Sequence, residues 1–234
     1  MENIIINTGA GKKFYSFGTM SGPMRLRDTF TVTLSAEHSF DIIQNKSMSS
    51  ATGWLVWPVA VEFCEYIFRN QWLIHGKSVI ELGSGTGLVG IVCSSMCSKL
   101  TVMSDLGEDL PICMDNMRLN AKFLRSSEGV HVKELYWGNL MHLQTLKNEF
   151  GLFDVIVGTD VVYHQGIEVL TALVETIVSL SHTGTEVLIA YEDREGMIED
   201  EPYFFGPLRA RFSTLSLIDL GNNRIIYHYK DFNG

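Results

Sequence analysis

A glycine-rich turn in the first half of the chain determines how the residues around it can be arranged. The turn reads Glu81-Leu-Gly-Ser-Gly-Thr-Gly87 and lies directly between two apolar stretches, residues 78–82 and 88–96. Glycine lets the backbone turn sharply and approach a ligand without a Cβ atom in the way, and the helix start beyond it offers unpaired N–H groups. The pattern predicts a buried strand, a ligand-binding turn and a helix in direct succession.

The glycine spacing also separates kinds of nucleotide site. A dinucleotide fingerprint reads G-x-G-x-x-G, because its pyrophosphate approaches the start of the helix closely. Here the glycines are Gly83, Gly85 and Gly87, and Leu88 stands where the last glycine of that fingerprint falls. The spacing therefore disfavours a nicotinamide-dependent oxidoreductase, which we keep as an alternative enzyme class.

Strands and helices alternate along most of the chain. Hydrophobic periodicity and short connections predict an α/β fold, doubly wound, with one mostly parallel sheet between layers of helices. The predicted strands are 30–34, 39–43, 78–82, 100–105, 130–136, 153–158, 186–191, 212–220 and 224–229, and the predicted helices are 58–68, 88–96, 110–120 and 167–180. The first two strands predict a short N-terminal β-hairpin, and the last two predict a C-terminal antiparallel strand pair.

Length, charge and cysteine usage limit the organisation and the partners. We expect the 234 residues to form a single folding unit over 51–234, with 1–50 as an N-terminal extension. The formal net charge of -9 has the wrong sign for gripping nucleic acid, and no segment reaches the roughly 18 apolar residues of a membrane span. Four irregularly spaced cysteines predict free thiols in a reducing compartment and no metal site, so we expect a cytoplasmic (alternatively nuclear) location. Nothing in the sequence demands more than a monomer.

Asp105 is the last residue of the strand predicted at 100–105, which comes after the glycine turn and its helix. A carboxylate at this place can accept hydrogen bonds from both hydroxyl groups of a ribose. An isolated aspartate at a strand end is as often a helix cap. Asp105 follows the glycine turn by about one βαβ unit in the sequence, and this separation favours the role in ribose binding. The two features together predict a nucleoside-containing cofactor.

Asp160 and Tyr163 follow the strand predicted at 153–158. Ligands of such sheets bind at the carboxyl ends of the strands, so both side chains are predicted to face one cleft. There a carboxylate can hold an amine and offset positive charge that forms on it, while a phenol can orient the amine and wall the cleft. A helix cap beside a half-buried tyrosine is the alternative.

Four blocks of sequence resemble the seven-β-strand methyltransferases of methyltransferase family 16, many of which are protein-lysine methyltransferases. The last block ends in the D-x-x-Y signature of that family. The blocks are Gly53-Trp-Leu-Val-Trp-Pro58, Val79-Ile-Glu-Leu-Gly-Ser-Gly-Thr-Gly-Leu-Val-Gly-Ile91, Tyr136-Trp-Gly138 and Phe153-Asp-Val-Ile-Val-Gly-Thr-Asp-Val-Val-Tyr163. The resemblance implies a Rossmann-like class I methyltransferase fold with a seven-stranded sheet, and S-adenosylmethionine as the cofactor of the domain at 51–234.

The resemblance also implies roles for individual residues. Asp160 and Tyr163 are implied at the methyl-accepting side, and Asp105 at the ribose. The residues implied to bind the rest of S-adenosylmethionine are Trp57, Glu81, Gly83, Ser84, Gly85, Trp137 and Thr159. We expect an N-methyltransferase that acts on a protein lysine, with an elongation factor or a chaperone among the substrates that the family suggests.

Other acceptors and roles stay open at this point. Pro58 stands where lysine-specific members commonly carry an acidic residue, so arginine, histidine and small amines are alternative acceptors. A non-catalytic interaction module is a more remote alternative, disfavoured by the intact site residues. The segment Glu192–Glu201 holds six acids and one base; it reads as a solvated loop, or as an acidic rim that attracts a basic partner.

Overall fold

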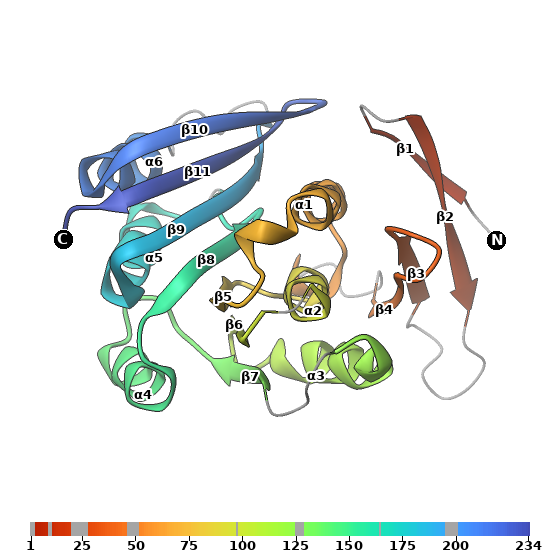
Figure 1. The fold of residues 1–234 in the computed structure, drawn as a ribbon, viewed down its shortest axis with the longest axis horizontal. Coiled ribbons are helices and arrows are strands. Elements are labelled where there is room, and N and C mark those ends of the chain that lie inside the picture. The colour runs from red at the N-terminus through yellow and green to blue at the C-terminus, as the bar shows by residue number, and fades with distance from the viewer. Residues whose placement is uncertain are drawn as a thin grey trace.

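The computed structural model describes residues 3–8, 11–19, 28–45, 52–96, 98–124, 129–163, 165–194 and 201–234. A seven-stranded sheet in the order β10-β11-β9-β8-β5-β6-β7 crosses the molecule (Figure 1). Its strands are β5 (Ser78–Leu82), β6 (Leu100–Asp105), β7 (Val130–Glu134), β8 (Phe153–Thr159), β9 (Ser181–Glu192), β10 (Phe212–Gly221) and β11 (Arg224–Phe232). β5 to β9 pair in parallel, and β11 pairs antiparallel with both β9 and β10.

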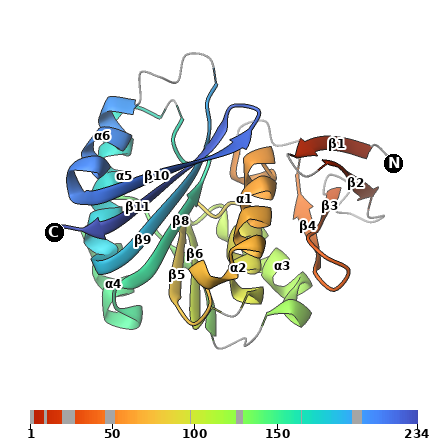
Figure 2. The ribbon, with the colours of Figure 1, turned by 45° about the horizontal axis from the view of Figure 1, so that its top comes forward.

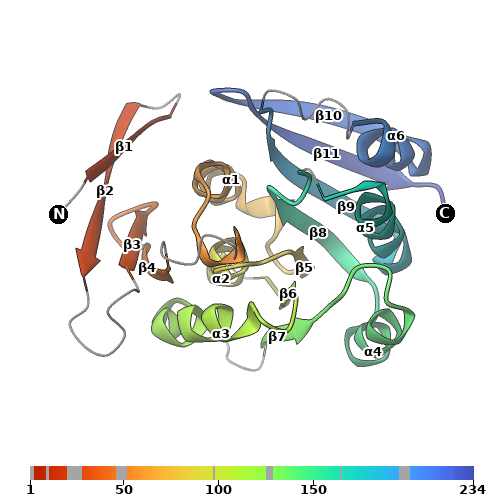
Figure 3. The ribbon, with the colours of Figure 1, turned by 180° about the vertical axis from the view of Figure 1, so that it is seen from behind.

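Helices cover both faces of this sheet. Figures 1 and 3, seen from opposite sides, show α1 (Pro58–Arg69), α2 (Leu88–Ser95) and α3 (Leu110–Leu119) on one face and α4 (Leu140–Phe150), α5 (Ile167–Leu180) and α6 (Glu201–Arg211) on the other. Short 3₁₀ turns lie at η1 (Thr52–Trp54), η2 (Gln71–Leu73) and η3 (Ala121–Phe123). The doubly wound α/β fold and its antiparallel ending are thereby confirmed.

The strands divide the core into two apolar layers, because successive side chains of a strand point to opposite faces. On β8, Val155 and Val157 join the buried cluster that contains α1 and α2. Ile156 joins the cluster on the other face, with α5 and α6. β8 is therefore buried on both faces, as expected of a central parallel strand.

The predicted N-terminal hairpin is present as β3 (Asp28–Thr33) and β4 (Ser39–Gln44), which pair antiparallel. It belongs to a larger sheet in the order β1-β2-β3-β4, where β1 (Asn3–Thr8) and β2 (Gly11–Thr19) are strands that the sequence did not indicate. Figure 2 shows this second sheet beyond the helices α1 to α3, away from the seven-stranded sheet.

Two buried asparagines, Asn116 of α3 and Asn120 directly after it, hold the hairpin against the rest of the fold. Asn116 accepts a hydrogen bond from the Ile43 N–H at 2.6 Å and donates to the Ile43 carbonyl at 2.9 Å. Asn120 makes the same pair of bonds with Asp41, at 3.1 and 2.8 Å. Asn116 also donates to the carbonyl of Thr86, so one side chain connects β4 with the glycine turn.

Among the described residues, no helix combines the length and the apolarity that a membrane crossing needs.

Candidate active site

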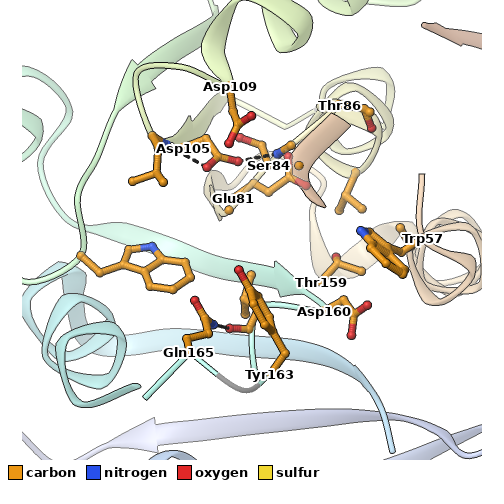
Figure 4. A pocket seen from close by; sticks show the side chains of 18 of the residues that line it. Trp57, Glu81, Ser84, Thr86, Asp105, Asp109, Thr159, Asp160, Tyr163 and Gln165 are labelled. Atoms are coloured by element: carbon orange, nitrogen blue, oxygen red, sulfur yellow. Dashed lines mark hydrogen bonds between the residues drawn. The ribbon is translucent and has the colours of Figure 1, made fainter. Parts of the chain in front are cut away.

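The ten site residues predicted from the sequence come together around one cavity of about 980 Å³. The cavity lies at the carboxyl ends of β5, β6 and β8, where the order of the strands reverses, as expected for ligands of this fold. In Figure 4, Asp105 and Asp109 lie on one side of it, Tyr163 and Gln165 on the opposite side, and Trp57, Thr159 and Asp160 at one end. The predicted lining residues are Trp57, Glu81, Gly83, Ser84, Gly85, Asp105, Trp137, Thr159, Asp160 and Tyr163.

The glycine turn after β5 has a backbone that other residues adopt poorly. Gly83 has a φ of 66° and Gly85 a φ of 50°, both in the left-handed region. A Cβ atom on Gly85 would lie 2.6 Å from the carbonyl oxygen of Gly53, closer than van der Waals contact allows. Ser84 ties the turn to β6, since its backbone N–H and its hydroxyl both donate to the Ser104 carbonyl, at 3.0 and 2.9 Å. The turn is therefore held in one conformation and leaves its backbone open to close approach by a ligand.

Asp105 lies at the end of β6 with its carboxylate facing the turn. One oxygen accepts the Gly85 N–H at 2.6 Å and the other accepts the Leu106 N–H at 2.8 Å. Burial raises the pKa of Asp105 to about 6, although these two hydrogen bonds oppose the rise. A carboxylate offers about four acceptor positions, so those that the backbone leaves unused are available to a pair of ribose hydroxyls.

Glu81 is buried beneath the turn, with 2% of its surface exposed. It accepts the backbone N–H of Gly90 in α2 at 2.9 Å. Burial raises the pKa of Glu81 to about 8, so the side chain is predominantly a neutral carboxylic acid at pH 7. In that form it can both accept and donate a hydrogen bond, and it lines the cavity.

The protonation of Glu81 makes a testable contribution to stability. The folded protein holds a proton up to about pH 8 that the unfolded chain loses near 4.5, the ordinary glutamate value. This contribution is complete below pH 4.5 and is lost as the pH rises through 8. We expect Glu81→Gln to flatten the fall in the free energy of unfolding between about pH 5.5 and 7.5, by up to about 1.4 kcal/mol per pH unit. Urea unfolding across this range measures the slope.

A matched control for that experiment is Glu175→Gln on the exposed side of α5. It removes one glutamate without touching the cavity, and its slope should equal that of the wild type. If Glu81→Gln also keeps the wild-type slope, Glu81 is ionised in the folded protein and its neutral form plays no part at the site.

Asp160 follows β8 directly and adopts a φ of 56°, unusual outside glycine. Its side chain is 4% exposed, and both of its oxygens are bound by the guanidinium of Arg194, at 2.9 and 2.6 Å. Burial raises the pKa of Asp160, and the Arg194 pair opposes the rise. Strained backbone of this kind is concentrated at functional sites.

Thr159, the neighbour of Asp160, carries a buried polar atom that faces the site. The hydroxyl oxygen of Thr159 is buried and makes no hydrogen bond within the part of the chain that the structure describes. Leaving a buried hydroxyl unpaired is costly, and Thr159 lines the cavity. It is thus suited to bind a polar group of a ligand that occupies the site.

Two tryptophans and one arginine form further walls. Trp57 caps the start of α1, and the Arg194 guanidinium lies 5.3 Å from the centroid of its ring. The Trp137 ring approaches Gly83, where a Cβ atom would come within 3.5 Å of it.

Two residues of the site were not predicted from the sequence. Arg194 was missed because the single base in an acidic run is typical of a solvated loop. Asp109, whose carboxylate packs against Gly53, was also missed.

The residues present fit S-adenosylmethionine in several independent ways. The turn leaves room for close approach of a ligand, the Asp105 carboxylate suits a ribose, and the Thr159 hydroxyl lacks a partner among the described residues. The cavity volume of about 980 Å³ lies in the range of cofactor sites. Fold and site together define a class I methyltransferase.

Comparison with known proteins identifies the family. Residues 35–210 match methyltransferase family 16, described as lysine methyltransferase, and the chain belongs to that family. Protein N-lysine methyltransferase METTL21A of Danio rerio is 34% identical over 176 residues, which cover 75% of each chain. METTL21A of Mus musculus is 30% identical over 195 residues, covering 83% of this chain and 84% of its own.

Solved structures show the same fold at low identity. The 16S rRNA N2 G1207 methyltransferase RsmC of T. thermophilus, in complex with AdoMet and guanosine, matches with a TM-score of 0.64 at 15% identity. That match covers 98% of this chain and 58% of RsmC, so the chain spans little more than half of that structure. A ribosomal protein L11 methylase of Lactobacillus delbrueckii matches with a TM-score of 0.53 at 16% identity, over 86% and 97% of the two chains. The chain is an S-adenosylmethionine-dependent methyltransferase.

Proposed function

We propose that this protein transfers a methyl group from S-adenosylmethionine to the side-chain amine of a lysine in a protein, at an acceptor site formed by Asp160 and Tyr163. The observation that carries the proposal is the placement of the buried Asp160 carboxylate in the cavity that also holds the glycine turn and Asp105. The family match and the relatives named protein N-lysine methyltransferase support lysine as the acceptor.

Each wall of the cavity receives one part of the cofactor in this proposal. Asp105 binds the ribose hydroxyls, and Trp137 lines the adenine site. Trp57 closes over the cofactor from the start of α1. The methionine part is bound by Glu81, Gly83, Ser84, Gly85 and Thr159. The cofactor supplies an electrophilic methyl group on a positively charged sulfur.

The acceptor side has modest chemical requirements. A lysine has a pKa of about 10.4 in water, so it arrives as an ammonium that Asp160 can pair with. It must lose a proton before it can offer its lone pair, and burial in the cleft assists this step by favouring the uncharged form. Transfer would form the N–C bond and break the bond between the methyl group and sulfur, which would leave S-adenosylhomocysteine and a positively charged nitrogen that loses a proton to solvent afterwards. Asp160 holds the nitrogen in place and stabilises that charge, while Tyr163 orients the amine and walls the cleft.

The finer assignments are part of the same proposal. We propose residues 51–234 as the methyltransferase domain with 1–50 as an extension, a monomer as the working form, and the cytoplasm as its location. An elongation factor or a chaperone is the first substrate to test, with no nucleic acid or membrane partner. A relative named EEF1A lysine methyltransferase 3, from Mus musculus, is 31% identical over 127 residues and supports the choice of a protein substrate.

A labelling experiment tests the function. The purified protein is incubated with S-adenosylmethionine that carries a radioactive methyl group and with the proteins of a cell extract, and labelled proteins are hydrolysed to amino acids. We expect the label in methylated lysine. Label confined to arginine, histidine or small amines would move the proposal to those acceptors, and no transfer at all would leave the interaction module as the better description.

A further inference from the structure

Arg194 already occupies the carboxylate to which the acceptor lysine is assigned. Its two terminal nitrogens lie 2.9 and 2.6 Å from the two oxygens of Asp160, a bidentate ion pair. Because Asp160 is only 4% exposed, a second cation that approached the same two oxygens would meet the guanidinium. The arrangement seen here therefore cannot also be the one in which Asp160 holds a lysine.

The pair is the end of a row of alternating charges. Arg194 lies 3.3 Å from Glu192, and the Nε of Arg224 lies 3.2 Å from the same Glu192 oxygen, a charge contact rather than an aligned hydrogen bond. Arg224 in turn binds Glu62 of α1 at 2.7 Å. Three carboxylates and two guanidinium groups leave this row with one negative charge in excess. The charges of the row would therefore be balanced by one further cation.

The two arginines of the row differ in their exposure and in whether they belong to a strand. Arg224 is 12% exposed, lies within β11 and pairs with a glutamate that is 4% exposed. Arg194 is 32% exposed and lies two residues beyond the end of β9, against the face of Trp57. The cation on Asp160 is thus the one that can move without disturbing a strand.

We propose that Arg194 is an internal competitor at the acceptor site, which takes the place of the lysine ammonium on Asp160 and keeps Glu192 as its partner when a lysine displaces it. This inference rests on the proposed function, which assigns Asp160 to the acceptor. One cation replaces another on Asp160, and Arg194 keeps a carboxylate partner, so no charge is left buried without a counter-ion. A side chain that brings a positive charge competes with the guanidinium for Asp160. An uncharged side chain of similar shape gains nothing from Asp160, whether Arg194 is there or not.

A competing internal cation lowers the apparent affinity of the site in proportion to the fraction of time it occupies Asp160. Removing it should tighten binding of a cationic ligand and leave an uncharged one unaffected. If Arg194 instead stays in place and only orients Asp160, its removal should weaken binding or leave it unchanged. The two roles predict opposite signs.

The test uses the full chain saturated with S-adenosylhomocysteine and two probes, Nα-acetyl-lysine amide and the uncharged Nα-acetyl-norleucine amide. Binding is followed by ligand-observed NMR. We expect Arg194→Gln to bind the lysine amide about tenfold more tightly than the wild type and the norleucine amide equally weakly. Glu192→Gln, which removes the receiving carboxylate, should bind the lysine amide about threefold more weakly.

The matched control is Arg118→Gln on the exposed face of α3. It changes the net charge by the same amount as Arg194→Gln, but Arg118 does not line the cavity. It should bind both probes as the wild type does. Equal binding of the lysine amide by Arg194→Gln and wild type, weaker binding by Arg194→Gln, or no binding by either, overturns the proposal.

A further variant separates this inference from the proposed function. Asp160→Asn removes the charge that both cations need, so it should weaken binding of the lysine amide in either background. If Asp160→Asn weakens binding but Arg194→Gln does not tighten it, only the displacement of Arg194 is wrong. If Asp160→Asn binds the lysine amide as tightly as the parent protein, the acceptor assignment itself fails.

Discussion

Asp160→Asn should lower the rate of methyl transfer about a thousandfold and change the affinity for S-adenosylmethionine by less than about threefold. The large effect is expected because the carboxylate faces the nitrogen on which positive charge forms, and asparagine cannot stabilise that charge. Asparagine is the right replacement at this position. The backbone φ of 56° is one that asparagine also tolerates, so the variant removes the charge without adding strain.

The measurement combines calorimetric titration of the cofactor with transfer of a labelled methyl group to the proteins of an extract. Asp193→Ala is the matched control, since Asp193 is exposed and lies beside Arg194 in sequence but does not line the cavity. It should keep the wild-type rate. Turnover by Asp160→Asn within about threefold of the wild type would remove Asp160 from the mechanism.

The strands and helices at the centre of the fold follow directly from local pattern. The turn from Glu81 to Gly87 is unambiguous, and α5 was predicted at the bounds that the structure gives it. α6 was missed because it contains Gly206 and Pro207, residues that ordinarily interrupt a helix. α4 was also missed, although Asn139 caps its first turn by accepting from the N–H groups of Met141 and His142. That cap was a readable signal.

The site was predictable where its residues lie next to strand ends. Asp105 and Asp160 each close a strand, so their placement follows once the strands are assigned and run parallel. Arg194 depends on a relation that local pattern does not contain, namely that β9 lies beside β8 with Thr159 opposite Ala190. Only that register brings Arg194 to Asp160, 34 residues away in sequence.

The order of the strands explains why the parts of the site meet. β5 lies between β6 and β8, and the chain changes direction across the sheet at this point. The turn after β5 is therefore flanked by Asp105 at the end of one neighbour and by Thr159 and Asp160 at the end of the other. The ribose and acceptor assignments consequently fall on opposite neighbours of one strand, and they can be tested independently.

Asp105→Ala tests the cofactor side, and it should weaken binding of S-adenosylmethionine about a hundredfold. Two hydrogen bonds from ribose hydroxyls to a charged acceptor are each worth about 1.5 kcal/mol or more, and about 1.4 kcal/mol corresponds to tenfold in affinity. The variant also removes the bonds from Gly85 and Leu106 that hold the turn. Asp105→Asn keeps one acceptor oxygen and should lose about tenfold.

Calorimetry with S-adenosylhomocysteine and with its analogue lacking the 2′ and 3′ hydroxyls assigns the loss to the ribose. The wild type should bind the analogue far more weakly, whereas Asp105→Ala should bind the two ligands almost equally, because the partner of the hydroxyls is gone. Asp115→Ala, on the same side of the sheet but paired with Arg118 on the surface of α3, should behave as the wild type. If Asp105→Ala still discriminates between the two ligands as the wild type does, the hydroxyls bind elsewhere and Asp105 serves only to hold the glycine turn.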